Sequence, residues 1–241
     1  MVFSVSADNI YSRGPHFYIY IVMYFGAILY LSASTVITAR EFQNRSRLLI
    51  YPLILFVMAE TIIQVALPEL HVTWLCVTLL SVLYFIYCSE MWNQLDALTG
   101  LLNQNSYLKQ TGGVRCKGGV LVVFDVDDFK QINDRYGHIQ GDLCLAGIAE
   151  CIKKSYANFG YCYRIGGDEF CVLLKNGGNE GRCKQEFLQR LQEKRGEIAF
   201  LPTVSYGSAP FSGEDIVKVK DRADQDMYQY KKERKNRKRL S

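Results

Sequence analysis

The chain has 241 residues and a formal net charge of only +4, so it lacks the strong basic excess of a domain that binds nucleic acid. Its eight cysteines include no Cys-x-x-Cys pair and accompany only three histidines. This composition excludes a disulfide framework and a zinc site of ordinary spacing. Charged residues are sparse from residue 17 to residue 87 and frequent from residue 96 onward. We therefore expect an apolar N-terminal region, 1–90, followed by one globular domain, 96–241.

Three apolar segments are predicted to cross a membrane as helices, at residues 17–39, 48–67 and 72–89. Each approaches the ~20 residues that span a hydrocarbon core of ~30 Å. The loop after the first segment contains three arginines, whereas the loop before the third contains neither lysine nor arginine. The positive-inside rule therefore predicts an N-terminus outside the membrane and a cytoplasmic domain after residue 90. Residues 91–95 are expected to continue the last helix into that domain as a linker.

The globular domain is expected to contain both strands and helices, judged from the period of its apolar residues. In chain order we expect a strand at 119–124, helices at 128–136 and 141–156, strands at 161–164 and 169–174, a helix near 182–194, a strand at 203–206 and a helix near 216–232. The short polar Gly-Gly connection between the second and third strands favours a hairpin. This order predicts an α+β fold in which helices pack on a sheet.

Two acidic clusters lie at loop positions next to predicted strands. Asp125, Asp127 and Asp128 follow the first strand, and Asp168 and Glu169 lie at the tip of the hairpin. If these strands are neighbours in the sheet, Asp125 approaches Asp168 and Glu169. Carboxylates that converge repel one another unless a cation lies between them, and hard oxygen ligands favour Mg²⁺.

A lysine and two glycines accompany these carboxylates. Lys130 supplies a positive charge suited to phosphate chemistry, and Gly166 and Gly167 let the backbone approach a bulky anionic ligand. The first acidic run has a simpler interpretation, as N-cap residues of the following helix. An EF-hand loop is excluded because its sixth position is Lys130 and its twelfth is Tyr136. Histidines are too few for a Ser-His-Asp arrangement, and neither a Walker nor a Rossmann glycine pattern occurs.

Several segments, in the right order, resemble the motifs of one enzyme family. Residues 164–170, RIGGDEF, are similar to the signature loop of the GGDEF family. The family's other motifs resemble residues 96–103, 124–134, 137–142 and 223–231. The resemblance covers residues 96 to about 236. It implies a nucleotidyl-cyclase-like α+β domain with a mainly antiparallel central sheet flanked by helices. The implied activity is that of a diguanylate cyclase, which condenses two GTP molecules into cyclic di-GMP and pyrophosphate.

The resemblance also implies roles at the reacting centre. Mg²⁺, or alternatively Mn²⁺, would bind the side chains of Asp125, Asp168 and Glu169 and the backbone carbonyl of Val126. Glu169 would also act at the 3′-hydroxyl, and whether Asp168 or Glu169 is the base is left open. Lys130 would stabilise charge on the phosphates.

A substrate pocket is implied in the same way. Its expected residues are Asn133, His138, Asp142, Gly166, Gly167, Lys231 and Lys235. Asn133 and Asp142 would read the guanine, because a carboxylate can accept both donors on the Watson–Crick edge of that base. Lys231 and Lys235 would contact the triphosphate.

The resemblance implies a homodimer, because each domain of this family holds one GTP and two subunits must face each other. With the apolar region, this places the enzyme at the bacterial cytoplasmic membrane, with the lipid bilayer and GTP as partners and no nucleic acid. The main alternative is a catalytically inactive GGDEF-like module that binds GTP or a partner protein. A cyclase that makes a different cyclic dinucleotide is a third reading, which the presence of Asp142 disfavours.

The sequence departs from the family pattern at three places. Gln104 stands where the opening motif usually has arginine. Residues 234–236, Arg-Lys-Asn, replace the usual Gly-Arg-Asn. Ala157 and Gly160 occupy the two positions of the Arg-x-x-Asp site through which the product inhibits many members of the family. We therefore expect no product inhibition through that site.

Overall fold

The computed structural model divides the chain into two compact units, Met1–Met91 and Trp92–Ser241. The residues described are 3–5, 11–16, 18–19, 22–23, 25–26, 29–30, 33, 55–56, 58–59, 62–63, 73–112 and 118–240. Two of the three segments predicted to cross a membrane, 17–39 and 48–67, lie mostly outside these residues.

The N-terminal unit contains a two-stranded ribbon and a long helix. β1 (Phe3–Val5) pairs antiparallel with β2 (Tyr11–Arg13), and α3 extends over Thr73–Trp92. α3 covers the third predicted span as a helix, and its Val82 and Phe85 are 50% and 72% exposed. In the described part of the chain, no helix is both long enough and apolar enough to cross a bilayer.

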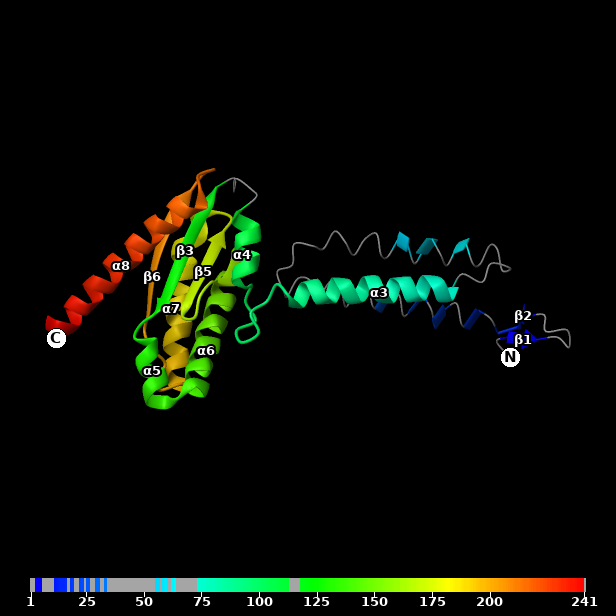
Figure 1. The fold of residues 1–241 in the computed structure, drawn as a ribbon, viewed down its shortest axis with the longest axis horizontal. Helices are drawn as coiled ribbons and strands as arrows, with labels where there is room; N and C mark the ends of the chain where they lie inside the picture. The colour runs from blue at the N-terminus through cyan, green and yellow to red at the C-terminus, as the bar shows by residue number, and fades with distance from the viewer. Residues whose placement is uncertain are drawn as a thin grey trace. The chain divides into compact units, whose positions relative to one another are not determined.

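The C-terminal unit is built on a four-stranded antiparallel sheet. Its strands are β3 (Gly119–Val126), β4 (Gly160–Arg164), β5 (Glu169–Leu174) and β6 (Val204–Phe211). Their order across the sheet is β4-β5-β3-β6, so β3 lies between β5 and β6 (Figure 1). The antiparallel register brings the end of β3 beside the start of β5. β3, which ends at the first acidic cluster, and β5, which begins at the second, are therefore neighbours.

Helices cover both faces of this sheet. They are α4 (Gln104–Thr111), α5 (Phe129–Tyr136), α6 (His138–Tyr156), α7 (Glu180–Glu197) and α8 (Ile216–Leu240). Side chains alternate between the two faces along a strand. Phe124 of β3 accordingly joins a core with residues of α6 and α7, whereas Val123 joins a core with residues of α4 and α8 (Figure 1). Burial on both faces explains why β3 is a nearly continuous apolar run.

The α+β fold with an antiparallel sheet flanked by helices is confirmed, and each strand and helix expected in the globular domain is present. Several elements differ from their expected extent, and one was not expected. α4 was not expected, and it begins at a cap in which Asn103 Oδ1 accepts a hydrogen bond from the Ser106 amide at 3.0 Å. β6 continues five residues beyond its expected end at residue 206, and α8 continues eight beyond residue 232.

Candidate active site at the end of β3

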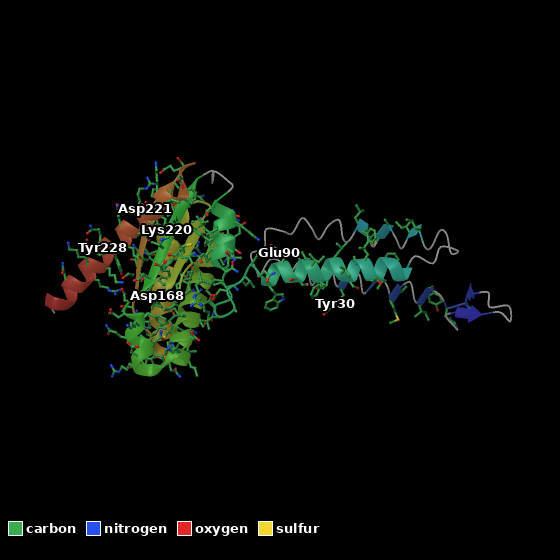
Figure 2. All side chains as sticks on the ribbon, viewed as in Figure 1. Tyr30, Glu90, Asp168, Lys220, Asp221 and Tyr228 are labelled. Atoms are coloured by element: carbon green, nitrogen blue, oxygen red, sulfur yellow. The ribbon has the colours of Figure 1, made fainter. Side chains whose placement is uncertain are left out.

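Acidic residues of two adjacent strands lie side by side at one end of the sheet. Asp125 of β3 is the register partner of Glu169 of β5. The Val126 amide donates a hydrogen bond to the Asp168 carbonyl at 3.2 Å, which ties the end of β3 to the hairpin tip. Figure 2 labels Asp168 at this end of the sheet. The predicted approach of Asp125 to Asp168 and Glu169 is therefore confirmed for their backbone positions.

A lysine from α8 neutralises the first of these carboxylates. Lys231 Nζ donates a hydrogen bond to Asp125 Oδ2 and lies 3.4 Å from Asp127 Oδ1. Partial burial lowers the pKa of Lys231, but the hydrogen bond and charge of Asp125, together with the charge of Asp127, raise this pKa above its ordinary value. The lysine therefore stays protonated. The structure brings this predicted triphosphate ligand to the acidic cluster across 106 positions of sequence.

Asp127 is buried, with only 4% of its surface exposed, and both of its carboxylate oxygens accept hydrogen bonds. Its Oδ1 accepts a hydrogen bond from Ser205 Oγ at 2.8 Å, and its Oδ2 accepts from Thr203 Oγ1 at 3.0 Å and from Arg234 Nη2. Burial raises the pKa of Asp127, but the hydrogen bonds from Arg234 and Ser205 hold it below its ordinary value. Asp127 is thus a charged structural residue within the fold.

Asp128 takes a third position in the same short run. It precedes α5 with a φ of 55°, in the left-handed region, and its exposed side chain makes no capping hydrogen bond. The interpretation of the acidic run as N-cap side chains is therefore wrong for this helix. Lys130 lies exposed in the first turn of α5, beside the end of β3 in sequence.

The hairpin tip is held by an arginine that sequence reasoning had given no role. Arg164 donates from Nη2 and Nε to the Gly167 carbonyl at 2.8 and 3.3 Å, and from Nη1 to Asp96 Oδ1 at 3.0 Å. Asp96 also accepts hydrogen bonds from the amide and hydroxyl of Thr99 at 2.9 and 2.6 Å. Burial raises the pKa of Asp96, but Thr99 and Arg164 hold it below its ordinary value. An ion pair between Asp96 and Arg164 therefore joins the motif at 96–103 to the signature loop at 164–170. The opposite charges of these two residues were the signal in the sequence for this contact.

Asn133 of α5 packs against α6 where the two helices meet. Asn133 Oδ1 is buried, and the described residues supply no hydrogen-bond partner to it. Gly141 packs directly against this amide, because a Cβ at position 141 would overlap Asn133 Oδ1 and lie 3.0 Å from Cγ. His138 and Asp142 lie exposed at the start of α6. The residues predicted to read guanine thus lie on adjoining helices, and Asn133 Oδ1 is a buried acceptor that no described residue satisfies.

The remaining predicted residues lie at the hairpin tip, at the end of β3 and on α8. Gly166 and Gly167 are exposed at the hairpin tip, and a Cβ at Gly166 would lie 3.3 Å from Glu169 Oε2. Val126 is buried at the end of β3. Lys235 belongs to α8, but its side chain lies outside the described residues.

The predicted metal ligands are oxygen donors at adjoining positions, which is the donor type that divalent cations such as Mg²⁺ prefer. Their chemistry therefore fits such an ion. Among the described residues, however, no three His, Cys, Asp or Glu side chains are arranged to hold a metal. The cation next to Asp125 is the Lys231 ammonium. The assignment of metal ligands to Asp125, Val126, Asp168 and Glu169 stays a prediction.

The antiparallel sheet flanked by helices, with acidic residues at the adjoining ends of β3 and β5, agrees with the nucleotidyl-cyclase-like fold expected from the sequence. A family model described as "Diguanylate cyclase, GGDEF domain" matches residues 93–237. The chain belongs to this family.

Individual relatives agree with the family. The diguanylate cyclase DgcS of Shewanella oneidensis is 32% identical over 154 residues, which cover 61% of this chain and 52% of that protein. The probable diguanylate cyclase DgcJ of Escherichia coli is 30% identical over 151 residues, which cover 59% of this chain and 30% of that protein. The chain therefore spans about half or less of the length of these two relatives.

Solved structures share the fold. The diguanylate cyclase SiaD of Pseudomonas aeruginosa, in complex with its activator SiaC, has a TM-score of 0.53 at 22% identity, covering 90% of this chain and 84% of that one. The coiled coil and GGDEF domain of DgcB from Caulobacter crescentus, in complex with c-di-GMP, has a TM-score of 0.53 at 24% identity, covering 66% and 93%. At these identities the likeness is one of fold.

Proposed function

We propose that this chain is an active diguanylate cyclase, which condenses two GTP molecules into cyclic di-GMP and two pyrophosphates. The observation that carries this proposal is the facing pair Asp125 and Glu169 at the end of two adjacent strands, with Lys231 Nζ on Asp125. A site that joins nucleotides through phosphate needs carboxylates for cation binding and a cation for the phosphates. Both kinds of group are present at this end of the sheet.

Each protein group has a task in this reaction. In each of two transfers, a ribose 3′-oxygen forms a bond to an α-phosphorus while the bond to the pyrophosphate leaving group breaks. Asp168 or Glu169 would accept the 3′-hydroxyl proton. Lys130, exposed in the first turn of α5, would offset charge on the phosphates. Asn133, with its free acceptor, would bind the guanine together with Asp142.

Members of this family generally use divalent metal ions, and we propose Mg²⁺ for this one, held by Asp125, Asp168, Glu169 and the Val126 carbonyl. When bound, the ion would supply positive charge next to the phosphate oxygens and favour a deprotonated nucleophile. Dimers are typical of the family, and we propose a homodimer here because each domain brings one of the two GTP molecules to be joined.

The test is product formation from GTP and Mg²⁺ by the full chain, next to Asp168→Ala and Glu169→Ala. Glu193→Ala is the matched control, because Glu193 is an exposed carboxylate of α7 whose partner is Gln189 at 2.9 Å. We expect cyclic di-GMP from the wild type and the control, and a loss of at least 100-fold in both site variants. GTP binding and dimer formation without any product would instead favour the catalytically inactive signalling module.

We further propose that residues 1–90 anchor the enzyme in the bacterial cytoplasmic membrane, with the N-terminus outside and the cyclase domain in the cytoplasm. The support is the apolar composition of 17–39 and 48–67 and the arginines between them. Fractionation of cells that express the full chain should find it in the membrane pellet after a carbonate wash. Recovery of the folded chain in the wash would contradict this proposal.

A further inference from the structure

Arg234 makes the most extensive set of hydrogen bonds between α8 and the sheet near the candidate site. Its Nη2 donates to Asp127 Oδ2 and to Thr203 Oγ1, the latter at 2.8 Å. Its Nη1 donates to the Val204 carbonyl at 3.2 Å. One planar guanidinium thus joins the end of β3 to the start of β6, which suits the fixed fork geometry of arginine.

Asp127, the carboxylate to which Arg234 donates, lies between the end of β3 and the start of β6. Asp127 directly follows the predicted metal ligands Asp125 and Val126, and its own amide donates to the Thr203 carbonyl at 2.9 Å. Its side chain is 3% exposed, so a ligand in solvent cannot reach it. A buried carboxylate is stable only when it is paired, and here Arg234 provides a charged partner through Nη2, which also donates to Thr203 Oγ1.

Arg234 lies three positions after Lys231, which places both side chains on one face of α8. Arg234 is also the last residue of α8 whose described side chain forms a hydrogen bond with the sheet. Helix ends fray when nothing holds them. Tyr230 packs on Tyr206 in the turn that carries Lys231, and Arg234 attaches the turn that follows it.

We propose that Arg234 is a positioning residue: it fixes the last attached turn of α8 on Asp127, and so holds Lys231 at Asp125 before nucleotide arrives. The role of Lys231 toward the triphosphate rests on the proposed function. The attachment of α8 is a property of the protein without nucleotide and is tested separately.

The test uses the full chain with Arg234→Gln, which keeps a good helix former and removes the charge and the fork. Arg222→Gln is the matched control, since Arg222 is an arginine of the same helix bound to the Pro210 carbonyl at 2.9 Å and to Glu214 at 2.8 Å. In the nucleotide-free protein, we expect amide exchange at residues 231–240 to be roughly tenfold faster in Arg234→Gln and unchanged in the control. Equal exchange in both would overturn the attachment.

Nucleotide affinity tests the positioning role without requiring turnover. Calorimetry with α,β-methylene GTP and Mg²⁺ should show roughly tenfold weaker binding for Arg234→Gln, partly restored in Arg234→Lys. If Arg234 acts through Lys231, adding Arg234→Gln to Lys231→Met should weaken binding no further. Unchanged affinity at lower thermal stability, or fully additive losses, would overturn the inference. A wild type that binds the analogue but makes no cyclic di-GMP would refute only the proposed function.

Discussion

Replacing Gly141 by alanine should separate nucleotide binding from stability. A Cβ there would overlap Asn133 Oδ1 and lie 3.2 Å from Cζ of Phe129. Both atoms are ends of side chains, so the asparagine amide can turn away while α6 keeps its place. Alanine also favours a helix over glycine by about 1 kcal/mol, which offsets part of the repacking cost. We therefore expect the free energy of unfolding to change by less than ~1 kcal/mol.

Binding of GTP should weaken in the same variant. The displaced Asn133 amide would lose its proposed hydrogen bond to guanine, which costs about 1.5 kcal/mol. That loss corresponds to a rise of roughly tenfold in the KM for GTP. Initial rates of cyclic di-GMP formation give KM, and thermal unfolding of the same preparation gives the stability.

Two controls make this reasoning refutable. Gly181→Ala in α7 is the same chemical change at a helical position where a Cβ meets no atom within 4 Å, and it should leave KM unchanged. In an Asn133→Ala background, Gly141→Ala should have no further effect on KM. If Gly141→Ala keeps the wild-type KM, or if its effect persists without Asn133, the assignment of Asn133 to the guanine site is wrong.

Three further predictions concern packing, pH and the product. Gly207→Ala would place a Cβ 2.7 Å from the Met227 Cα in α8, so urea unfolding should show a loss of about 2–3 kcal/mol, and an unchanged midpoint would contradict this packing. Because the pKa of Asp127 is lowered in the folded protein, its charged form stabilises the fold at pH values above the ordinary pKa of aspartate. This stability is lost as the pH falls through the lower pKa of the folded state. The free energy of unfolding should therefore fall below about pH 4, and Asp127→Asn should reduce that dependence. Ala157→Arg combined with Gly160→Asp should not create a calorimetrically detectable cyclic di-GMP site, since a Cβ at Gly160 would lie 2.9 Å from the Leu174 Cα.

The sheet and its main helices could be predicted because their signals are local. β3 is a short apolar run between turn residues, and the hairpin after it is marked by a Gly-Gly pair. The second half of β6 was missed because Gly207 and Pro210 disfavour a strand. Its position at the edge of the sheet explains why Pro210 is tolerated there. α4 was missed because its eight mostly polar residues depend on the Asn103 cap and on burial of Tyr107.

Only those residues of the candidate site that belong to a recognisable motif could be predicted from the sequence. The backbone approach of Asp125 to Glu169 follows from the strand order, and the resemblance supplied Lys231. Nothing local distinguishes Asp127 from Asp125, since both belong to one acidic run. Their difference comes from Thr203, Ser205 and Arg234, which are 76 to 107 positions away in sequence. Tertiary partners at that separation leave no signal in a single sequence.

Lys231 and Arg234 of α8 therefore differ in the exposure of their carboxylate partners. Arg234 is committed to Asp127, whose side chain is 3% exposed, whereas Lys231 pairs with Asp125, whose side chain is 21% exposed. A ligand in solvent can compete for the second pair and cannot reach the first. Under the proposed function, a divalent ion held by Asp125 would replace Lys231 as its partner, and the Lys231 ammonium would then be available to the triphosphate. Arg234 thus fixes the turn of α8 that follows Lys231, while Lys231 keeps a partner that a ligand in solvent can replace.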